Sequence, residues 1–379
     1  MKKIKLKNIL MAIVALSEGM AGGVASVYCL DHLTENAGKD KIIPYMLLYL
    51  AALAVFYVVQ VIVHEAGHLV FGLMTGYEFV SFRIFSHSFS RQEGKLTHKR
   101  FNIVGTLGQC LMTWPEDKDI DKAPYFWYHF GGGAFNLISA VIMSSVFLIL
   151  EGRGRYLLLF GAVVSLFLAV TNLIPSRIGG VANDGMNILT LTKKPEDRRL
   201  LLQNLIVNAK QYRGERLRDM EEKYFQGGDP EGDTFQNAVA LMCASRELDR
   251  HEFEKAGELF SQMLNNEDLL DVYKMESKCE LMFTKLMTEA DKCQADELYD
   301  KKLRKYVEIT GNTYISRKRL LFAYDLIILK DKTEADKEFN LAANMKDSYP
   351  ARGEYDSEME LIELVKERYY YNSIENEEN

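Results

Sequence analysis

The chain has 379 residues, a formal net charge of −7 and five cysteines. This length is enough for two or three domains, and the charge is distributed unevenly: residues 1–190 hold 16 Lys+Arg and 13 Asp+Glu, net +3, whereas residues 191–379 hold 30 and 40, net −10. The contrast excludes a single domain of uniform composition. No two cysteines form a CxxC pair, so we interpret them as ordinary buried thiols.

Four apolar runs in the first half are long enough to cross a bilayer, which takes about 20 residues in a helix. One of them carries a single charged residue, Glu18, and the other three contain no Asp, Glu, Lys or Arg. The runs are Ile9–Leu30, Ile42–Val63, Tyr125–Leu150 and Tyr156–Pro175. They predict an integral membrane domain of about four spans over residues 1–190.

The lysines at positions 2, 3, 5 and 7 place the N-terminus in the cytoplasm by the positive-inside rule. The segment 31–41 then lies outside, and the segments 76–124 and 190–379 lie inside. This predicts a multi-pass plasma-membrane protein with both termini in the cytoplasm. The N-terminus also has the basic start and apolar core of a cleaved signal peptide. We favour an uncleaved anchor, because Glu18 interrupts the core and no clear small-x-small cleavage site follows.

Residues 61–72 read VIVHEAGHLVFG and place ionisable side chains at the end of the second run. His64 and His68 are four apart, so on a helix both imidazoles project from one face and can bind one zinc. Glu65 lies about 100° around the helix, where it reaches the attacking water and can act as a general base. An HExxH match can arise by chance. The apolar setting favours a site, because ionisable groups in hydrocarbon are costly.

A catalytic zinc of this kind takes three protein ligands and leaves one position open. The fourth run ends TNLIPSRIGGVANDGMNIL, which offers Asp184 followed by Gly185. The second and fourth runs both descend from outside to inside, so His64 and Asp184 are expected on the same side of the membrane. The alternatives for the third ligand are Glu78, His87 and His98. We expect these two histidines and His129 to be surface or interfacial groups.

Three motifs together resemble the site-2 proteases, which are intramembrane zinc metalloproteases that cleave membrane-embedded peptides. The motifs are HEAGH at the end of a span, FGGGAFN at 130–136, and NLIP…DG between 172 and 185. The resemblance covers roughly residues 42–190. The gap from Pro175 to Asp184 is longer than in the commonest form of the motif, and Gly132-Gly133 stands where many members have Gly-Pro.

The resemblance implies one Zn²⁺ per chain, held by His64, His68 and Asp184. It also implies Glu65 as the general base and Asn172 as a polar helper beside the catalytic water or oxyanion.

The segment 77–112 alternates apolar and polar residues on either side of a turn at Gln92-Glu93-Gly94, which predicts a β-hairpin. It resembles the small sheet that follows the active-site helix in the family, whose edge can hold an extended substrate by strand addition. The alternative is a plain cytoplasmic cap.

The acidic half is predicted to be helical and repetitive. We expect a linker and first helices over 191–234 and a cytoplasmic helical-repeat domain over 235–379. An Ala-x-x-x-aromatic pattern recurs there at spacings of 39 and 40 residues, at Ala256–Phe260, Ala295–Tyr299 and Ala335–Phe339. The pattern resembles tetratricopeptide repeats, although the repeat is longer than usual. A plain helical bundle is the alternative.

The sequence therefore predicts a mainly α protein: a polytopic membrane zinc endopeptidase with a cytoplasmic helical domain. Its expected partners are the lipid bilayer, a membrane-embedded peptide or protein substrate, and a cytoplasmic protein bound by the repeats, with no nucleic acid. The alternative is a non-catalytic membrane scaffold with a structural metal, against which the presence of Glu65 argues. A metal transporter would need ionisable residues spread along several spans.

Overall fold

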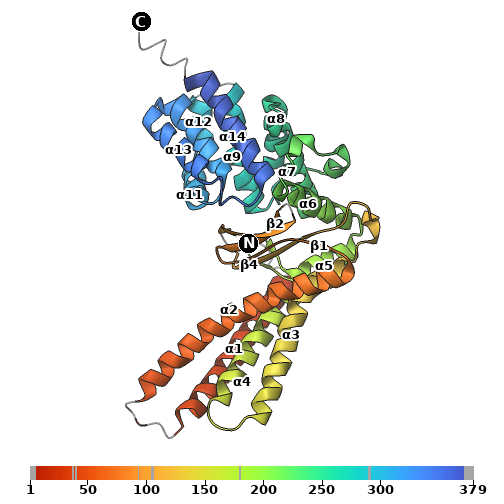
Figure 1. The fold of residues 1–379 in the computed structure, drawn as a ribbon, viewed down its shortest axis with the longest axis vertical. Coiled ribbons are helices and arrows are strands. Elements are labelled where there is room, and N and C mark those ends of the chain that lie inside the picture. Colours follow the sequence, from red (N-terminus) through yellow and green to blue (C-terminus); the bar gives the residue numbers. More distant parts are fainter. Residues whose placement is uncertain are drawn as a thin grey trace. The chain divides into compact units, whose positions relative to one another are not determined.

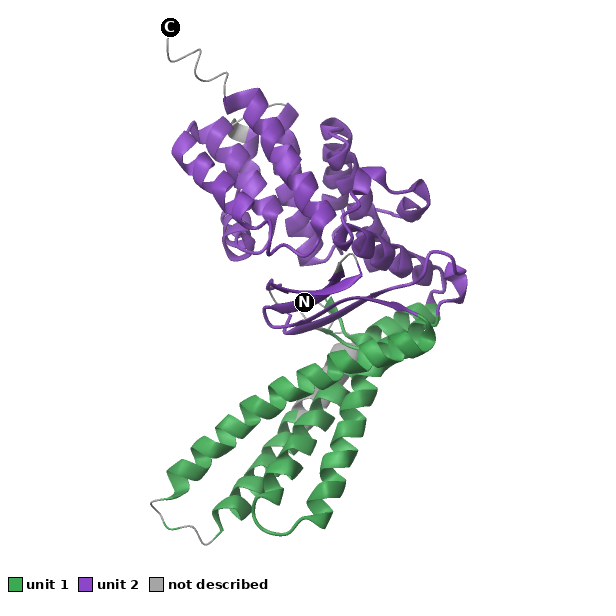
Figure 2. Ribbon diagram, viewed as in Figure 1, with its two compact units in different colours: residues 1–76, 124–193 green, residues 77–123, 194–379 purple. Residues whose placement is uncertain are grey.

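The computed structural model describes residues 6–35, 38, 41–92, 94–103, 106–178, 181–288 and 292–370 (Figure 1). The chain forms two compact units, coloured separately in Figure 2. Unit 1 comprises residues 1–76 and 124–193, and unit 2 comprises residues 77–123 and 194–379.

Unit 1 is a bundle of helices. In chain order the helices are α1 (Leu6–Thr34), α2 (Ile42–Thr75), α3 (Tyr125–Ile149), α4 (Arg155–Leu173) and α5 (Asp184–Lys193). Two short strands, β5 (Arg177–Ile178) and β6 (Val181–Ala182), pair antiparallel between α4 and α5. Helix α3 packs against both α2 and α4, and α1 packs mainly on α4.

Within the described residues, three helical stretches are long and apolar enough to cross a membrane: Ile42–Thr75, Ile120–Ile149 and Arg155–Leu173. Large apolar side chains such as Leu47, Ile142 and Leu148 are exposed on them, as expected for a surface that faces lipid. The remaining predicted span, Ile9–Leu30, falls within α1. It stays a prediction, because the side chains of residues 6–16 and of Glu18 lie outside the described part, as do Lys2, Lys3 and Lys5.

Helix α2 is longer than the apolar run that predicts it and carries the HEAGH sequence inside its last four turns. It ends at Gly76, which adopts φ 96° and donates its N–H to the carbonyls of Gly72 and Leu73. A left-handed residue at this position is the usual helix stop, and glycine adopts it without a Cβ penalty. His64 and His68 are therefore held on regular helix.

Helices α2 and α3 approach each other closely at a pair of glycines. A Cβ added to Gly131 would lie 2.5 Å from the carbonyl oxygen of Gly67, and a Cβ on Gly67 would collide with the backbone of Gly131. Only residues without a Cβ allow this crossing. The FGGG sequence is thereby brought against the HEAGH turn.

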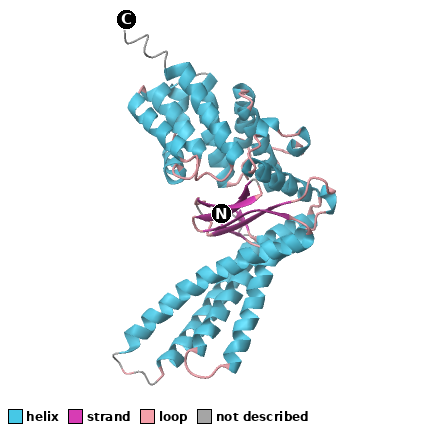
Figure 3. Ribbon diagram, viewed as in Figure 1, coloured by secondary structure: helices cyan, strands magenta, loops and turns pink. Residues whose placement is uncertain are grey.

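Unit 2 contains a four-stranded antiparallel sheet, drawn in magenta in Figure 3, with the strand order β3-β2-β1-β4. Its strands are β1 (Glu78–Ile84), β2 (His87–Gln92), β3 (Lys95–Arg100) and β4 (Gly108–Thr113). The predicted hairpin corresponds to β2 and β3, with Gly94 at φ 78° in the turn, while Glu93 lies outside the described residues. The sheet belongs to the same compact unit as residues 194–379, and the predicted domain boundaries stay a prediction.

The rest of unit 2 is helical. Its helices are α6 (Glu196–Tyr212), α7 (Thr234–Asp249), α8 (Phe253–Leu264), α9 (Asp271–Thr288), α10 (Lys292–Leu298), α11 (Lys301–Thr310), α12 (Ile315–Tyr324), α13 (Lys332–Asn344) and α14 (Arg352–Val365). Asp233 starts α7 with a capping box closed by Gln236, at the end of the stretch 191–234 that was predicted to hold a linker and the first helices.

The alanines of the predicted repeat pattern are all buried in the helical core of unit 2. Ala256 and Ala335 are 0% exposed and Ala295 is 1% exposed. The second copy of the pattern is interrupted, because α10 ends at Leu298 and α11 begins at Lys301, so that Tyr299 lies between two helices.

Candidate metal centre

Three side chains that can bind a metal converge in unit 1. The Nε2 atoms of His64 and His68 are 3.1 Å apart, and they lie 3.2 and 3.4 Å from Oδ2 of Asp184. The three ligand atoms all fall within 4.8 Å of one another. The structure thus brings together the three residues predicted as metal ligands, two from α2 and one from the first residue of α5.

Hydrogen bonds fix the tautomer of both histidines. Nδ1 of His68 donates to the backbone carbonyl of Tyr128 at 2.7 Å, and Nδ1 of His64 donates to Oδ1 of Asn136 at 2.9 Å. With the proton on Nδ1, the Nε2 atom of each neutral imidazole carries a lone pair. Two lone pairs and a carboxylate oxygen at these separations repel one another, and a cation among them would remove the repulsion. The donor set therefore fits a divalent metal, and two nitrogens with one oxygen suit zinc.

A buried polar network orients Asn136. Its Nδ2 donates to both the backbone carbonyl and Oε1 of Gln60, each at 3.0 Å, so its Oδ1 is the atom turned to His64. Gln60 in turn accepts from Ser165 Oγ at 2.7 Å and donates to Ser139 Oγ at 2.9 Å. Asn136, Gln60 and Ser165 are at most 1% exposed. Such partners orient a metal ligand and raise its basicity.

Gly132 provides the space in front of the histidines. A Cβ added at this position would lie 2.5 Å from His64 Cε1 and 2.5 Å from His68 Nε2. Any other residue at 132 would therefore press on the metal-binding atoms. The second of the two glycines, Gly133, faces the side chain of Leu173 on α4.

Asn183 holds the turn that presents Asp184. Its Nδ2 donates to the carbonyls of Thr171 and Ile174, both at 2.7 Å, and its Oδ1 accepts from the backbone N–H of Ser176 at 3.0 Å and of Met186 at 2.9 Å. One amide side chain thus ties the end of α4 to the start of α5. Gly185 allows the start of α5 to lie close against the end of α4, because a Cβ at this position would collide with the carbonyl of Leu173.

His129 lies beside the candidate centre. It is 6% exposed, and its Nδ1 is 3.7 Å from Oδ1 of Asp184, the carboxylate oxygen that does not face His64 and His68. Its Nε2 is buried and has no hydrogen-bond partner among the residues that the structure describes. The sequence prediction treated His129 as a surface or interfacial group, which is wrong: the packing of α3 buries it.

The two residues predicted to be catalytic occupy different settings. Glu65 is partly buried, on the same helical turn as His64. Asn172 donates through Nδ2 to the carbonyl of Leu168 in its own helix, at 2.9 Å. No hydrogen bond between the described residues joins Asn172 to the three ligands, so its predicted role as a polar helper stays a prediction.

The alternative third ligands all belong to unit 2 and have partners there. Glu78 forms an ion pair with Arg213 at 3.2 Å. His87 and His98 stack on each other, with Nδ1 and Nε2 3.0 Å apart across the β2–β3 pair.

The sequence analysis did not identify Gln60 and Asn183 as residues that orient the ligands, and it included Asn136 only as the last residue of the FGGGAFN motif. Gln60 is the one amide in the run Ile42–Val63 and lies four residues before His64, which is a signal that could have found it. Asn136 and Asn183 gain their roles only through packing between helices.

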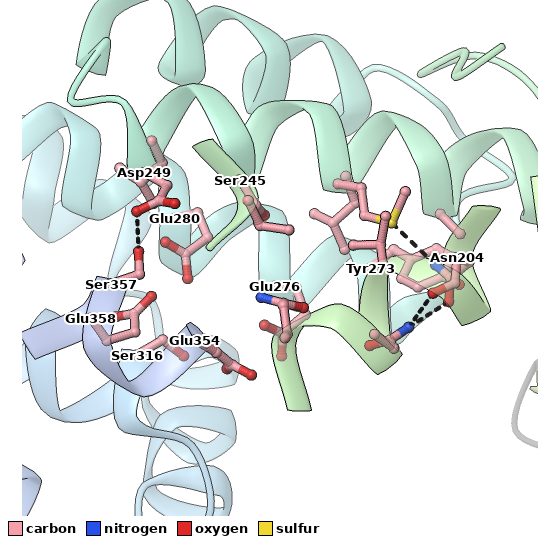
Figure 4. Close-up of a pocket in the computed structure, with 18 of the residues that line it drawn as sticks. Asn204, Ser245, Asp249, Tyr273, Glu276, Glu280, Ser316, Glu354, Ser357 and Glu358 are labelled. Carbon is pink, nitrogen blue, oxygen red and sulfur yellow. Dashed lines mark hydrogen bonds between the residues drawn. The ribbon is translucent and has the colours of Figure 1, made fainter. Parts of the chain in front are cut away.

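Unit 2 has a separate acidic cavity of about 230 Å³ within the helical array, shown in Figure 4. The glutamates around it include Glu276, Glu280, Glu354 and Glu358, from helices α9 and α14. Arg319, 0% exposed, donates to both Glu280 and Glu358, and its guanidinium lies 3.8 Å from the centre of the Phe283 ring. Glu280 and Glu358 are thus part of an ion-pair network that joins α9, α12 and α14.

No protein-family model, curated protein or solved structure matches the chain.

Proposed function

We propose that this protein is a membrane-embedded zinc endopeptidase of the site-2 protease type. The observation that carries the proposal is the convergence of His64, His68 and Asp184, with both imidazoles held in the tautomer that leaves Nε2 free for a metal. A purely structural metal site has no use for an adjacent base, and Glu65 is present within the same turn of α2.

His64, His68 and Asp184 would hold one zinc and leave its fourth position open, as catalytic sites of this class do. Zinc bound there would polarise a carbonyl and lower the pKa of a water from 15.7 towards about 7. Glu65 accepts the proton of the attacking water and passes it to the leaving amine. Asp184 would offer Oδ2 to the metal, the oxygen that lies 3.2 and 3.4 Å from Nε2 of His64 and His68.

The substrate class follows from the setting of the ligands. His64 and His68 lie on α2, which has the length and hydropathy of a membrane span, and Asp184 begins the short helix α5, which follows the span-like helix α4. Both α2 and α4 expose large apolar side chains. We propose that the enzyme cleaves membrane-embedded regulators or peptide precursors in the plasma membrane. The basic N-terminus and the lysines and arginines of the segment 76–124 support cytoplasmic termini. The helical part of unit 2 would bind a cytoplasmic protein partner.

Cleavage of membrane peptides co-expressed with the wild type or with Glu65→Gln tests the proposal. The glutamine keeps the size of the side chain and cannot accept the proton, so the variant should lose at least about a hundredfold in rate. Equal cleavage by both proteins would exclude the proposed activity.

A further inference from the structure

A second cavity in unit 2, of about 870 Å³, is lined mainly by basic side chains. The cations are Arg91, Lys99, Arg213, Lys346 and Arg352; the remaining lining residues are Gly94, Tyr212 and Asp347. The surrounding sequence has the opposite character, because residues 191–379 carry a net charge of −10. The cavity is therefore a positively charged site in an otherwise acidic part of the chain.

The fold assembles this cavity from segments that are distant in the sequence. Arg91 and Lys99 lie on β2 and β3, Arg213 directly follows α6, and Arg352 begins α14. Nζ of Lys99 donates to the carbonyl of Tyr349 at 3.0 Å, and the ring of Phe101 packs edge-on against Tyr349 with centroids 5.3 Å apart. The sheet edge is thereby joined to the connection between α13 and α14.

Internal ion pairs neutralise only part of the positive charge. Arg213 pairs with Glu78 at 3.2 Å, and Nε of Arg352 bonds to Asp356 at 3.1 Å. The other three cations face the single lining carboxylate, Asp347. Within the described residues Arg91 and Lys346, both exposed, form no ion pair.

The positive charges around the cavity also repel one another. Lys99 is partly buried, and burial, followed by the charge of the neighbouring Arg352, lowers the pKa of its ammonium group, against the opposite effect of Asp347. Holding unpaired cations around one cavity costs free energy, and a bound anion would offset that cost.

We propose that this basic cavity binds a phosphate-bearing anion, supplied as the headgroup of an anionic phospholipid or as a soluble phosphate compound. Guanidinium groups match the oxygens of a phosphate in bidentate geometry. Three cations against one carboxylate leave an excess that suits the roughly −1.5 to −2 charge of a phosphate monoester better than a single carboxylate. The site is independent of the proposed peptidase activity, since none of its residues belongs to unit 1.

The test is calorimetric titration of the full-length protein in a neutral detergent at low salt. The probes are inorganic phosphate, dihexanoyl phosphatidic acid and, as a neutral headgroup for comparison, dihexanoyl phosphatidylcholine. The variant is Arg91→Gln with Lys346→Gln, which removes two exposed cations without breaking an ion pair. The matched control is Lys301→Gln with Lys305→Gln on α11, which makes the same change in net charge at two exposed lysines away from the cavity.

We expect the wild type to bind phosphate or phosphatidic acid, the cavity variant to bind at least about tenfold more weakly, and the control to stay within about twofold. Binding of phosphatidic acid alone would identify the source as lipid, and binding of inorganic phosphate at equal strength would identify it as soluble. The proposal is overturned if neither probe binds the wild type, if phosphatidylcholine binds as well as phosphatidic acid, or if the control loses as much affinity as the cavity variant.

Discussion

Gly132 lies against the metal-binding nitrogen of His68: a Cβ on Gly132 would be 2.5 Å from Nε2. The contact joins the HEAGH turn of α2 to the FGGG turn of α3 through a position that cannot carry a side chain. It makes a glycine outside the ligand set essential for the geometry of the centre.

Gly132→Ala is therefore expected to displace the imidazoles and to weaken zinc binding by at least about tenfold, the effect of disturbing the surroundings of a metal ligand. Zinc content after purification, and competition with a chelating dye, would measure the loss. Gly154→Ala is the control, because a Cβ at Gly154 meets nothing within 4 Å. Equal zinc binding by wild type and Gly132→Ala would show that the helices are farther apart than described.

Asn136→Ala should release His64 from its fixed tautomer, because Oδ1 of Asn136 is the acceptor for Nδ1 of His64. We expect a loss of about 10–100-fold in zinc affinity. Asn172→Ala is the informative comparison, since its amide bonds to its own helix. That variant should retain the metal, and any loss of cleavage with the metal retained would support the helper role that the family resemblance implies.

The orientation in the membrane can be tested by cysteine accessibility in a chain without its five native cysteines. Probes within 31–41 should react with an impermeant reagent added outside, and probes within 76–124 or at Asn237 should react only after the membrane is opened. Labelling of Asn237 from outside would reverse the predicted topology.

Unit 2 should lose stability as the pH rises through the range in which Glu354 ionises. Burial raises the pKa of Glu354 to about 7, with a further contribution from the charge of Glu358, while the bond from the hydroxyl of Tyr349 acts in the opposite direction. The folded-state pKa of Glu354 lies above the unfolded value, so ionising this carboxyl lowers the free energy of unfolding. This loss of stability is absent below about pH 4.5, grows from there to about pH 7, and is constant above.

Glu354→Gln keeps an acceptor for Tyr349 and cannot ionise, so it should raise stability relative to wild type by about 1–3 kcal/mol at pH 8 and by much less at pH 5. Thermal unfolding followed by circular dichroism of the full-length protein at both pH values measures the difference. Glu254→Gln, an exposed glutamate of α8, is the control. A stabilisation by Glu354→Gln that is equal at the two pH values would contradict the assigned ionisation.

The sequence was sufficient for the parts of the site that depend on local spacing. His64 and His68 share a helical face because they are four residues apart, and Asp184 was predicted from its motif and the direction of the spans. Gln60 could have been found from its position four residues before His64, but the roles of Asn136 and His129 could not be predicted in the same way. Their roles depend on how α3 packs on α2, which the close approach of Gly67 and Gly131 allows.

In the sheet, too, local sequence patterns predict only the pairing of strands that are close in the sequence. The β2–β3 hairpin follows from alternation and a turn, because its partners are close in sequence. Strand β4 pairs with β1 across the intervening hairpin, with a register shift between Phe79 and Ser81. Nothing in the local pattern of Gly108–Thr113 specifies that partner.

The most direct test of the central claim is the zinc content of purified wild type, Asp184→Ala and Glu65→Gln, measured together with cleavage of a membrane peptide. We predict one zinc per chain and cleavage for the wild type, one zinc without cleavage for Glu65→Gln, and neither for Asp184→Ala, because losing one of three ligands removes the metal. An Asp184→Ala protein that still holds one zinc per chain and still cleaves would contradict the account.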